Sequence, residues 1–476
     1  FNLTRKDVHT AAGIETTTNT YDEARDGFFN LGQLTTAVRT TGDKRFTQAY
    51  DYDATGRLAR RSDLGVNGQD YAQSFEYWPD GTLKRKRLAD GTWTGTYRYD
   101  EAGRLFSIGN ANPPSGTEPE QFISSILYNA RGQTTAISYG GGVTTSFGYN
   151  EARGFLSRVL TQKTGQTLLD LSYSRNAKGL ITAVASPDPT RAWSYGYDAL
   201  DRLVSADNLG GSGDDRTYAY DDADNMLANS ALCGGAGLVY GAGGRPHAPA
   251  SICGAPVTYD ANGNTLSYDP DGPGPLERRS IAYNGENRPV SVTAFGHVAS
   301  FDYGPDGARA GKSFLGAKHF YLGPDAEVLF GQASVAGVVT SYLHADVRRE
   351  GSATDVMVKD HLASNRLVLR VGAGTMRSDY GPFGQPLTSN GSVPLQGKGY
   401  INERYDPETG LQYLNARYYD PQLGMFLQPD WWEVMRAGVG TNRYSYSFGD
   451  PVNGIDPSGP FSCDRQETAA QARRCV

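Results

Sequence analysis

Five aspartates near the C-terminus are the residues whose type and spacing could do chemistry. They lie in a stretch rich in aromatic residues and Asp-Pro pairs, and they are Asp406, Asp420, Asp430, Asp450 and Asp456. Two carboxylates held close together in a partly dry site cannot both ionise easily, so one keeps a proton. The ionised member can activate water while the protonated member donates to a carbonyl. Asp before Pro is also ordinary turn chemistry, so spacing alone does not select a pair.

The cysteines and histidines are weaker candidates for chemistry. Cys233 with Cys253, and Cys463 with Cys475, could each close a short loop, and both disulfides and free thiols stay open. Neither pair has the close spacing of zinc ligands. A lone histidine such as His361 is more often a hydrogen-bonded structural residue, and the Gly-rich GAGGRP lacks the Lys-Ser/Thr ending of a phosphate-binding loop. We expect no metal and no cofactor.

The composition indicates many short hairpins. The 476 residues include 59 Gly, 30 Tyr and 24 Pro, and Tyr favours strands whereas Gly and Pro favour turns. The net charge of -7 and the lack of a long basic block argue against a nucleic-acid partner. No apolar run approaches the roughly 18 residues of a transmembrane segment. Because Phe1 opens directly into polar sequence without an initiator Met, we expect the chain to be the C-terminal part of a longer protein.

A short sequence phrase recurs along the chain. It predicts the strands and turns that would position the five aspartates. It reads YDATGRL at Tyr52, YDEAGRL at Tyr99, YDALDRL at Tyr197 and YDANGNTL at Tyr259. Weaker copies begin at Tyr77, Tyr128, Tyr149, Tyr173, Tyr220, Tyr283 and Tyr303, and consecutive starts of all copies are mostly 20 to 25 residues apart. We expect the Tyr to end one strand, Asp/Asn and Gly to make the turn, and Leu to begin the next strand.

Isolated hairpins are marginal, so these units must pair edge to edge into one long sheet. The predicted fold class is therefore all-β, with an ordinary β-solenoid or propeller as the alternative. Two Gly/Pro-rich intervals, from Cys233 to Pro256 and from Asp269 to Leu276, are predicted to be long surface loops.

From Tyr21 to Tyr303 this phrase resembles the YD-repeat (RHS-repeat) family of secreted bacterial proteins. The resemblance implies β-hairpins joined in a long curled sheet, a partial spiral shell. VKDHLASNRLVLRV and the following DYGPFGQPL resemble the segment that precedes the terminal core in RHS proteins. We therefore divide the chain into a repeat sheet (1–303), a bridging β region (304–396), a core that caps the shell (397–460) and a C-terminal tail or start of an effector (461–476).

YDPETGLQYLNARYYDPQLGMF and NRYSYSFGDPVNGIDPSG resemble the RHS-repeat-associated core domain. In that family the core closes the shell and often acts as an intramolecular aspartic protease, which implies that Asp430 and Asp456 are catalytic. Cleavage is then expected in the region Gly459, Pro460 and Phe461. The family usually has Leu where this chain has Pro460, and the Pro460–Phe461 bond is the first choice for the cut.

The resemblance implies a secreted or cell-surface bacterial toxin shell that encapsulates a C-terminal effector and frees it by cleavage. Expected partners are that effector, an N-terminal remainder of the shell, and secretion machinery or carbohydrate. The alternative is a cell-surface carbohydrate-binding or structural YD-repeat protein without protease activity. An independent hydrolase is the least favoured class, because the sequence has no nucleophile–base–acid set.

Overall fold

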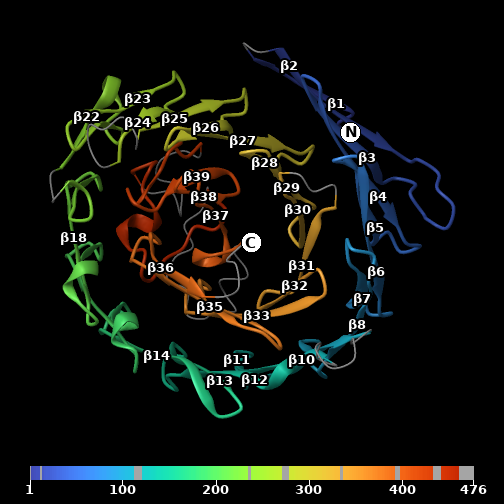
Figure 1. Cartoon of the computed structure of the whole chain (residues 1–476), viewed down its shortest axis with the longest axis horizontal. Coiled ribbons are helices and arrows are strands. Elements are labelled where there is room, and N and C mark those ends of the chain that lie inside the picture. The colour runs from blue at the N-terminus through green and yellow to red at the C-terminus, as the bar shows by residue number, and fades with distance from the viewer. Residues whose placement is uncertain are drawn as a thin grey trace.

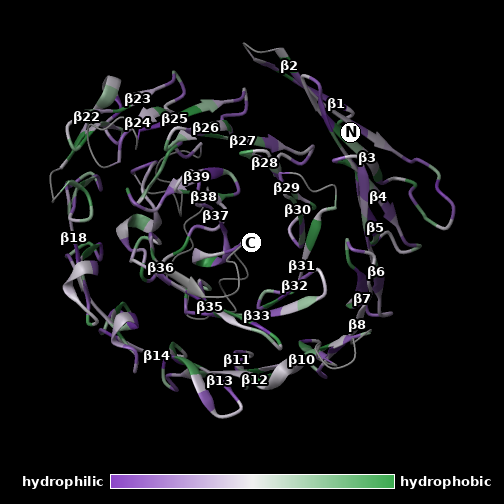
Figure 2. Ribbon diagram, in the orientation of Figure 1, coloured by the Kyte–Doolittle hydropathy of each residue, from purple (hydrophilic) through white to green (hydrophobic). Residues whose placement is uncertain are grey.

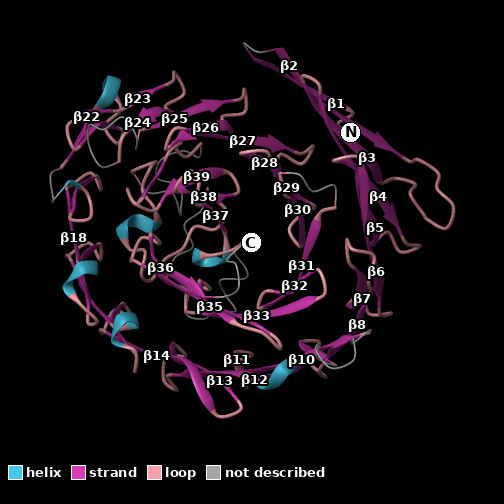
Figure 3. Cartoon of the chain, viewed as in Figure 1, coloured by secondary structure: helices cyan, strands magenta, loops and turns pink. Residues whose placement is uncertain are grey.

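The computed structural model describes residues 2–10, 13–111, 121–233, 237–270, 278–332, 336–391, 397–431 and 441–459. These residues form antiparallel strands joined by turns, with a few short 3₁₀ helices (Figure 3). The 3₁₀ helices are Gly140–Gly142, Pro189–Arg191, Ser212–Asp214, Ala242–Gly244, Tyr400–Asn402 and Ser447–Gly449. The all-β prediction is confirmed.

The strands belong to five sheets in which each strand pairs with its neighbours in sequence. The first sheet contains β1 (Arg5–Thr10), β2 (Gly13–Tyr21), β3 (Leu34–Thr41), β4 (Lys44–Tyr52), β5 (Leu58–Val66), β6 (Gln69–Tyr77) and β7 (Leu83–Arg87). The second contains β8 (Thr94–Tyr99), β9 (Leu105–Asn110), β10 (Gln121–Tyr128), β11 (Thr134–Tyr139), β12 (Val143–Tyr149), β13 (Leu156–Lys163), β14 (Gln166–Arg175), β15 (Ile181–Ala185), β16 (Trp193–Tyr197), β17 (Leu203–Asn208), β18 (Arg216–Tyr220) and β19 (Met226–Asn229).

The third sheet contains β20 (Leu238–Tyr240), β21 (Pro249–Ile252) and β22 (Ala255–Pro256). The fourth contains β23 (Thr258–Tyr259), β24 (Thr265–Tyr268), β25 (Arg279–Tyr283), β26 (Pro289–Ala294), β27 (His297–Tyr303), β28 (Arg309–Phe314), β29 (Ala317–Tyr321), β30 (Ala326–Phe330), β31 (Val338–His344), β32 (Val347–Glu350), β33 (Ala353–Lys359), β34 (Asn365–Arg370), β35 (Thr375–Tyr380) and β36 (Pro386–Gly391). The fifth contains β37 (Arg404–Asp406), β38 (Leu411–Leu414), β39 (Arg417–Asp420) and β40 (Met425–Phe426).

The recurring phrase makes the turn that joins one hairpin to the next. After β4 ends, Asp53 Oδ1 accepts hydrogen bonds from the backbone N–H groups of Thr55 and Arg57, at 2.9 and 3.0 Å. Gly56 has a φ of +79°, which a residue without Cβ adopts at no steric cost. The Arg57 guanidinium bonds to Asp53 Oδ2 at 2.8 Å and to the carbonyl of Trp78 in the next turn at 3.2 Å. The phrase therefore closes its own turn and ties it to its neighbour.

In most repeats the tyrosine of the phrase ties its unit to the unit before it. The Tyr77 hydroxyl donates to the Leu58 carbonyl at 2.7 Å, and the Tyr99 hydroxyl donates to the Leu83 carbonyl at 3.0 Å. The same hydroxyl-to-carbonyl bond recurs at Tyr52, Tyr128, Tyr149, Tyr197, Tyr240, Tyr259, Tyr283 and Tyr303. The expected strand–turn–strand order is thus confirmed in atomic detail.

One repeat start predicted from the sequence is wrong by two residues. Strand β14 ends at Arg175, not at Tyr173, and Arg175 Nη1 donates to the Leu156 carbonyl at 2.7 Å in place of the usual tyrosine hydroxyl. Tyr173 is buried and its ring lies 4.7 Å from that of His361. An arginine can donate the same hydrogen bond as the tyrosine hydroxyl. The repeats therefore share this hydrogen bond rather than one residue type at this position.

The interval from Cys233 to Pro256 is also corrected, because much of it is not a surface loop. It contributes β20, β21 and β22, and the Tyr240 hydroxyl donates to the Met226 carbonyl, which is the bond that recurs in most other repeats. A disulfide joins Cys233 to Cys253. Cys463 and Cys475 lie outside the described residues, as does most of the interval from Asp269 to Leu276.

The sheets wind into a spiral (Figure 1). The chain runs from β1 around an outer ring through β14, β18 and β22 to β27, and then β29 to β36 pass inside that ring. Contacts join the layers: Lys86 Nζ donates to the Tyr342 carbonyl at 2.8 Å, and Gln73 Nε2 donates to the Leu322 carbonyl at 3.0 Å. Strand pairing is continuous across residue 303, since β27 pairs with β28. The curled sheet is thereby confirmed.

The inner layer differs from the outer layer in its pattern of burial. In β3 of the outer layer buried and half-buried residues alternate, whereas β33 and β34 each contain five consecutive buried residues. Figure 2 shows the same contrast, with more hydrophilic colour along β4–β7 than along β30–β31. Alternation fits a sheet with one wet face, and continuous burial fits a sheet covered on both faces. The terminal core contacts this layer, since the Gly399 carbonyl accepts the Asn365 N–H of β34 at 3.0 Å.

Three parts of the chain share one hydrophobic core. It includes Leu171 and Trp193 from the outer layer, Val358 from the inner layer, and Tyr419 and Tyr446 from the terminal core. Burial of such side chains contributes about 25 cal/mol for each Å² of apolar surface removed from water. The terminal core is therefore held inside the coil (Figure 1).

Candidate functional site

The two aspartates selected from the sequence meet at one arginine. Arg417 Nη2 lies 3.3 Å from Asp430 Oδ2 and 3.2 Å from Asp456 Oδ2. Asp430 is 2% exposed, Asp456 is 1% exposed and Arg417 is 5% exposed. The structure thus brings together two carboxylates that are far apart in the sequence, in a site largely closed to water.

Strand β39 positions the arginine, and two turns bring the aspartates to it. Arg417 is the first residue of β39, and its guanidinium stacks on the Phe426 ring of the adjacent β40, 3.6 Å from the ring centroid. Asp430 is fixed by a backbone pair with Arg443, whose carbonyl accepts the Asp430 N–H at 2.8 Å. The same Arg443 carbonyl accepts from Arg417 Nη1 at 3.0 Å.

Asp456 belongs to a closed turn that ends at Gly459. Asp456 Oδ1 accepts the Gly459 N–H at 2.8 Å, and the Gly459 carbonyl accepts from Arg417 Nε. Gly459 has a φ of +88°, and a Cβ at this position would lie 2.5 Å from the Leu414 carbonyl oxygen. Only glycine fits here. Pro460 and Phe461 lie outside the described residues.

The charges at this site differ from a simple carboxylate pair that shares a proton. Burial lowers the pKa of Arg417, while Asp456 and Asp430 oppose that shift. The Arg417 guanidinium lies 3.3 Å from the Asp430 carboxylate and 3.2 Å from the Asp456 carboxylate. The arrangement therefore places two carboxylates around one guanidinium, and the Arg443 guanidinium also lies beside Asp430, where it donates to the Asp430 backbone carbonyl.

The other Asp-Pro aspartates have different partners. Asp420 is fully buried and binds Arg279, and it also accepts the Tyr268 hydroxyl at 2.7 Å. Asp406 binds Arg309 and lies 2.9 Å from Lys312 Nζ. Burial opposes ionisation of Asp406, but Arg309 and Lys312 outweigh burial and hold the pKa of Asp406 below its ordinary value.

These cations come from β25 and β28 of the spiral, so Asp406 and Asp420 anchor the terminal core to the sheet. Asp450 bonds to the side chain of Asn453 at 2.9 Å, as a turn residue does. Among these five aspartates, the shared arginine distinguishes Asp430 and Asp456.

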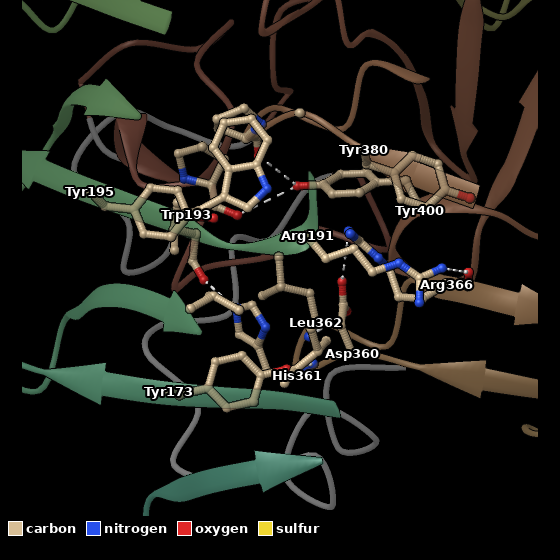
Figure 4. A pocket seen from close by; sticks show the side chains of 16 residues that line it. Tyr173, Arg191, Trp193, Tyr195, Asp360, His361, Leu362, Arg366, Tyr380 and Tyr400 are labelled. Atoms are coloured by element: carbon tan, nitrogen blue, oxygen red, sulfur yellow. Dashed lines mark hydrogen bonds and ion pairs between the residues drawn. The ribbon is translucent and has the colours of Figure 1, made fainter. Parts of the chain in front are cut away.

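A cavity of about 50 Å³ lies between the outer layer, the inner layer and the terminal core (Figure 4). Tyr173 and Trp193 line it from the outer layer, and His361 and Arg366 line it from the inner layer. His361 Nε2 lies 2.8 Å from the Val452 carbonyl and so carries the proton it donates. Burial lowers the pKa of His361. The space suits a few water molecules, and His361 serves the junction as the structural residue expected.

Sequence reasoning missed Arg417, although it stands in the quoted segment YLNARYYD. Its partners are distant in sequence, and an arginine before two tyrosines gives no local pattern that points to them. Among the described residues, no group of three His, Cys, Asp or Glu side chains is arranged to hold a metal ion. The same residues include no helix long and apolar enough to cross a membrane.

No family model matches the chain, but it is similar in sequence to curated proteins that include bacterial toxins. The tRNA3(Ser)-specific nuclease WapA of Bacillus spizizenii is 26% identical over 350 residues, which are 70% of this chain and 14% of WapA. Toxin protein Tse5 of Pseudomonas aeruginosa is 24% identical over 431 residues, which are 86% of this chain and 30% of Tse5. The chain therefore spans a minor part of the curated relatives it matches.

The fold is also found among solved structures. In the crystal structure of TcdB2-TccC3-Cdc42, one chain superimposes with a TM-score of 0.72 at 18% identity, over 95% of this chain and 27% of that chain. A spiral of hairpins with YD turns, wound around a terminal core, defines the class as a coiled β-shell. The YD turns, the fold and the sequence relatives, which include Rhs proteins, support an RHS-repeat (YD-repeat) protein.

Proposed function

We propose that this chain is the encapsulating shell of a secreted bacterial RHS toxin, and that its core cuts the chain in the region Gly459, Pro460 and Phe461. The observation that carries the proposal is that Asp430 and Asp456 share the Arg417 guanidinium, which also binds the Gly459 carbonyl. A carboxylate can take a proton from water while the guanidinium withdraws electron density from the carbonyl.

The test is the intact mass of the purified wild-type chain and of two variants. Asp456→Asn removes one carboxylate of the site, and Asp450→Asn makes the same change in an Asp-Pro turn away from Arg417. The proposal expects loss of the C-terminal tail in the wild type and in Asp450→Asn, and its retention in Asp456→Asn. An uncleaved wild type under folding conditions would reject it.

The shell role rests on the coiled architecture and on the relatives that are toxins. An effector enclosed by the spiral is the partner of the inner face. Strand β1 lies at the edge of the first sheet, and we place the upstream part of the shell there, because an unpaired edge offers N–H and C=O groups to further strands. Cross-linking of β1 to residues upstream of it in the longer protein would test this placement.

Carbohydrate binding receives no separate support from the aromatic residues of the outer layer. Lys84 lies over the Trp78 ring at 5.2 Å and Arg85 lies over the Trp93 ring at 4.5 Å, so a cation already covers a face of each. It stays a prediction from the sequence, as do delivery by secretion machinery and a cell-surface location. Binding of the chain to a glycan array, without self-cleavage, would favour it over the shell proposal.

A further inference from the structure

The wall of the coil is interrupted on both sides of its smallest sheet. Within the described residues, β20, β21 and β22 pair only with one another, whereas β8–β19 and β23–β36 form continuous ladders. On one side the Tyr240 hydroxyl donates to the Met226 carbonyl at 3.0 Å, and on the other the Tyr259 hydroxyl donates to the Pro249 carbonyl at 2.8 Å. Side-chain contacts therefore join this sheet to its neighbours, where paired strands join the units within the longer sheets.

The Cys233–Cys253 disulfide crosses one of these interruptions. Cys233 follows a turn that is fixed to the second sheet, because the Ser230 N–H donates to the Thr217 carbonyl of β18 at 3.0 Å. Cys253 lies in the turn between β21 and β22 of the third sheet. The disulfide is thus a covalent link between two sheets that share no strand pairing in the described chain.

The terminal core lies directly behind this link. Leu232 and Ile252, which precede the two cysteines, belong to one hydrophobic cluster with Leu423 of the terminal core. The Asn229 side chain donates to the Gln422 carbonyl at 3.1 Å. Figure 1 shows the terminal core inside the wall formed by β22 to β25. A change in the wall at this place would therefore uncover the terminal core.

We propose that the Cys233–Cys253 disulfide is a thiol-exchange site that closes the wall over the terminal core, and that its reduction by a small thiol opens the wall at β20–β22. Both cysteines are half-buried, so each keeps part of its surface open to solvent, as labile disulfides do. The bond joins residues 20 positions apart, and closing a loop restricts the states open to the chain between its ends. The inference goes beyond the proposed shell, because it names the chemistry that opens the wall.

Thiol–disulfide exchange supplies the reaction without a cofactor. A thiolate of the reductant attacks one sulfur, a mixed disulfide forms, and the other cysteine leaves as a thiolate. A second thiol of the reductant then displaces the attached cysteine. Two electrons pass from the reductant to the protein, and the two protons lost by the reductant end on the cysteines. The products are two cysteine thiols and one disulfide of the reductant.

Amide hydrogen exchange with and without dithiothreitol tests the proposal. The full chain carries Cys463→Ser and Cys475→Ser, so that Cys233 and Cys253 are its remaining cysteines. Alkylation should label neither cysteine before reduction and both after it. Reduction should raise the exchange rate of the amides in β20–β22 about tenfold or more, because loss of the link favours the locally open state. Labelling of both cysteines without reductant, or unchanged exchange in β20–β22 after reduction, would overturn the proposal.

The boundary between the first and second sheets is an internal control. There the Leu88 N–H donates to the Thr92 carbonyl at 2.7 Å, and no cysteine precedes residue 233 in the sequence. Exchange at this boundary should not respond to dithiothreitol. In the same background, Cys233→Ala with Cys253→Ala should exchange in β20–β22 as fast as the reduced chain, whether or not dithiothreitol is present. An equal rise at both boundaries on reduction would mean general loosening and would also reject the proposed site.

Discussion

Two sets of buried aspartates in the terminal core share a local sequence and differ in their partners. Asp406 and Asp420 each have at least one cation of their own from the spiral, whereas Asp430 and Asp456 divide the single Arg417. A buried carboxylate paired with its own cation suits an anchor between the terminal core and the spiral, because both charges are compensated. Two carboxylates that converge on one guanidinium in a closed site are the arrangement on which the proposed cleavage depends. The partners of the carboxylates, rather than the Asp-Pro motif, therefore separate the two sets.

The largest effect should come from breaking an anchor. Asp420→Asn leaves the Arg279 guanidinium buried without a counter-charge, and removal of one partner of a buried pair costs about 3–5 kcal/mol. Denaturant unfolding measures this loss. As a control, Asp170→Asn breaks the exposed pair with Arg158 and should cost about 0–1 kcal/mol. Equal losses in the two variants would show that Asp420 is not an anchor.

Acid should weaken the anchors at a defined pH. The pKa of folded Asp406 lies below the ordinary aspartate value of 3.8, so the stability that it contributes is fully present above pH 3.8. This stability is lost as the pH falls through the folded-state pKa. The free energy of unfolding should therefore decrease as the pH is lowered from 4 toward 2. Asp406→Asn should be less stable at neutral pH and should show a shallower decrease; an equally steep decrease would assign the acid sensitivity to other carboxylates.

The shared site should tolerate a substitution that the anchors do not. In Asp430→Asn the Arg417 guanidinium keeps Asp456 as its counter-charge, so the free energy of unfolding should fall by only about 1 kcal/mol. The proposed cleavage should nevertheless be lost, and intact mass on the same sample measures it. A loss of stability as large as that of Asp420→Asn would erase the distinction between the two sets.

The sequence predicts the local part of this structure well because the YD turn is local. Asp53, Gly56 and Arg57 satisfy one another within five residues, so the strand ends at Tyr52 and Leu58 follow from composition and conformation alone. The inward winding does not follow, since it depends on contacts such as that between Lys86 and the Tyr342 carbonyl, 256 residues apart.

The candidate site shows the same limit. Asp430 and Asp456 come from a family resemblance, but nothing in the spacing indicates that they meet at Arg417. The interval from Cys233 to Pro256 was predicted as a loop because its glycines outnumber its strand-forming residues, yet the Tyr240 hydroxyl satisfies the repeat. Strand pairing with neighbours overrode a weak local preference.

The smallest effect is expected from Ser458→Ala, which tests whether Arg417 or the Ser458 hydroxyl orients Asp456. Ser458 Oγ lies 3.5 Å from Asp456 Oδ1, at the limit of a hydrogen bond, whereas the Gly459 N–H reaches the same oxygen at 2.8 Å. Ser458→Ala should therefore change the free energy of unfolding by less than about 0.5 kcal/mol and leave the proposed cleavage rate unchanged. Denaturant unfolding and a time course of intact mass measure the two quantities. A marked loss of cleavage in Ser458→Ala would mean that the hydroxyl orients Asp456, and the shared guanidinium would then no longer account for the site by itself.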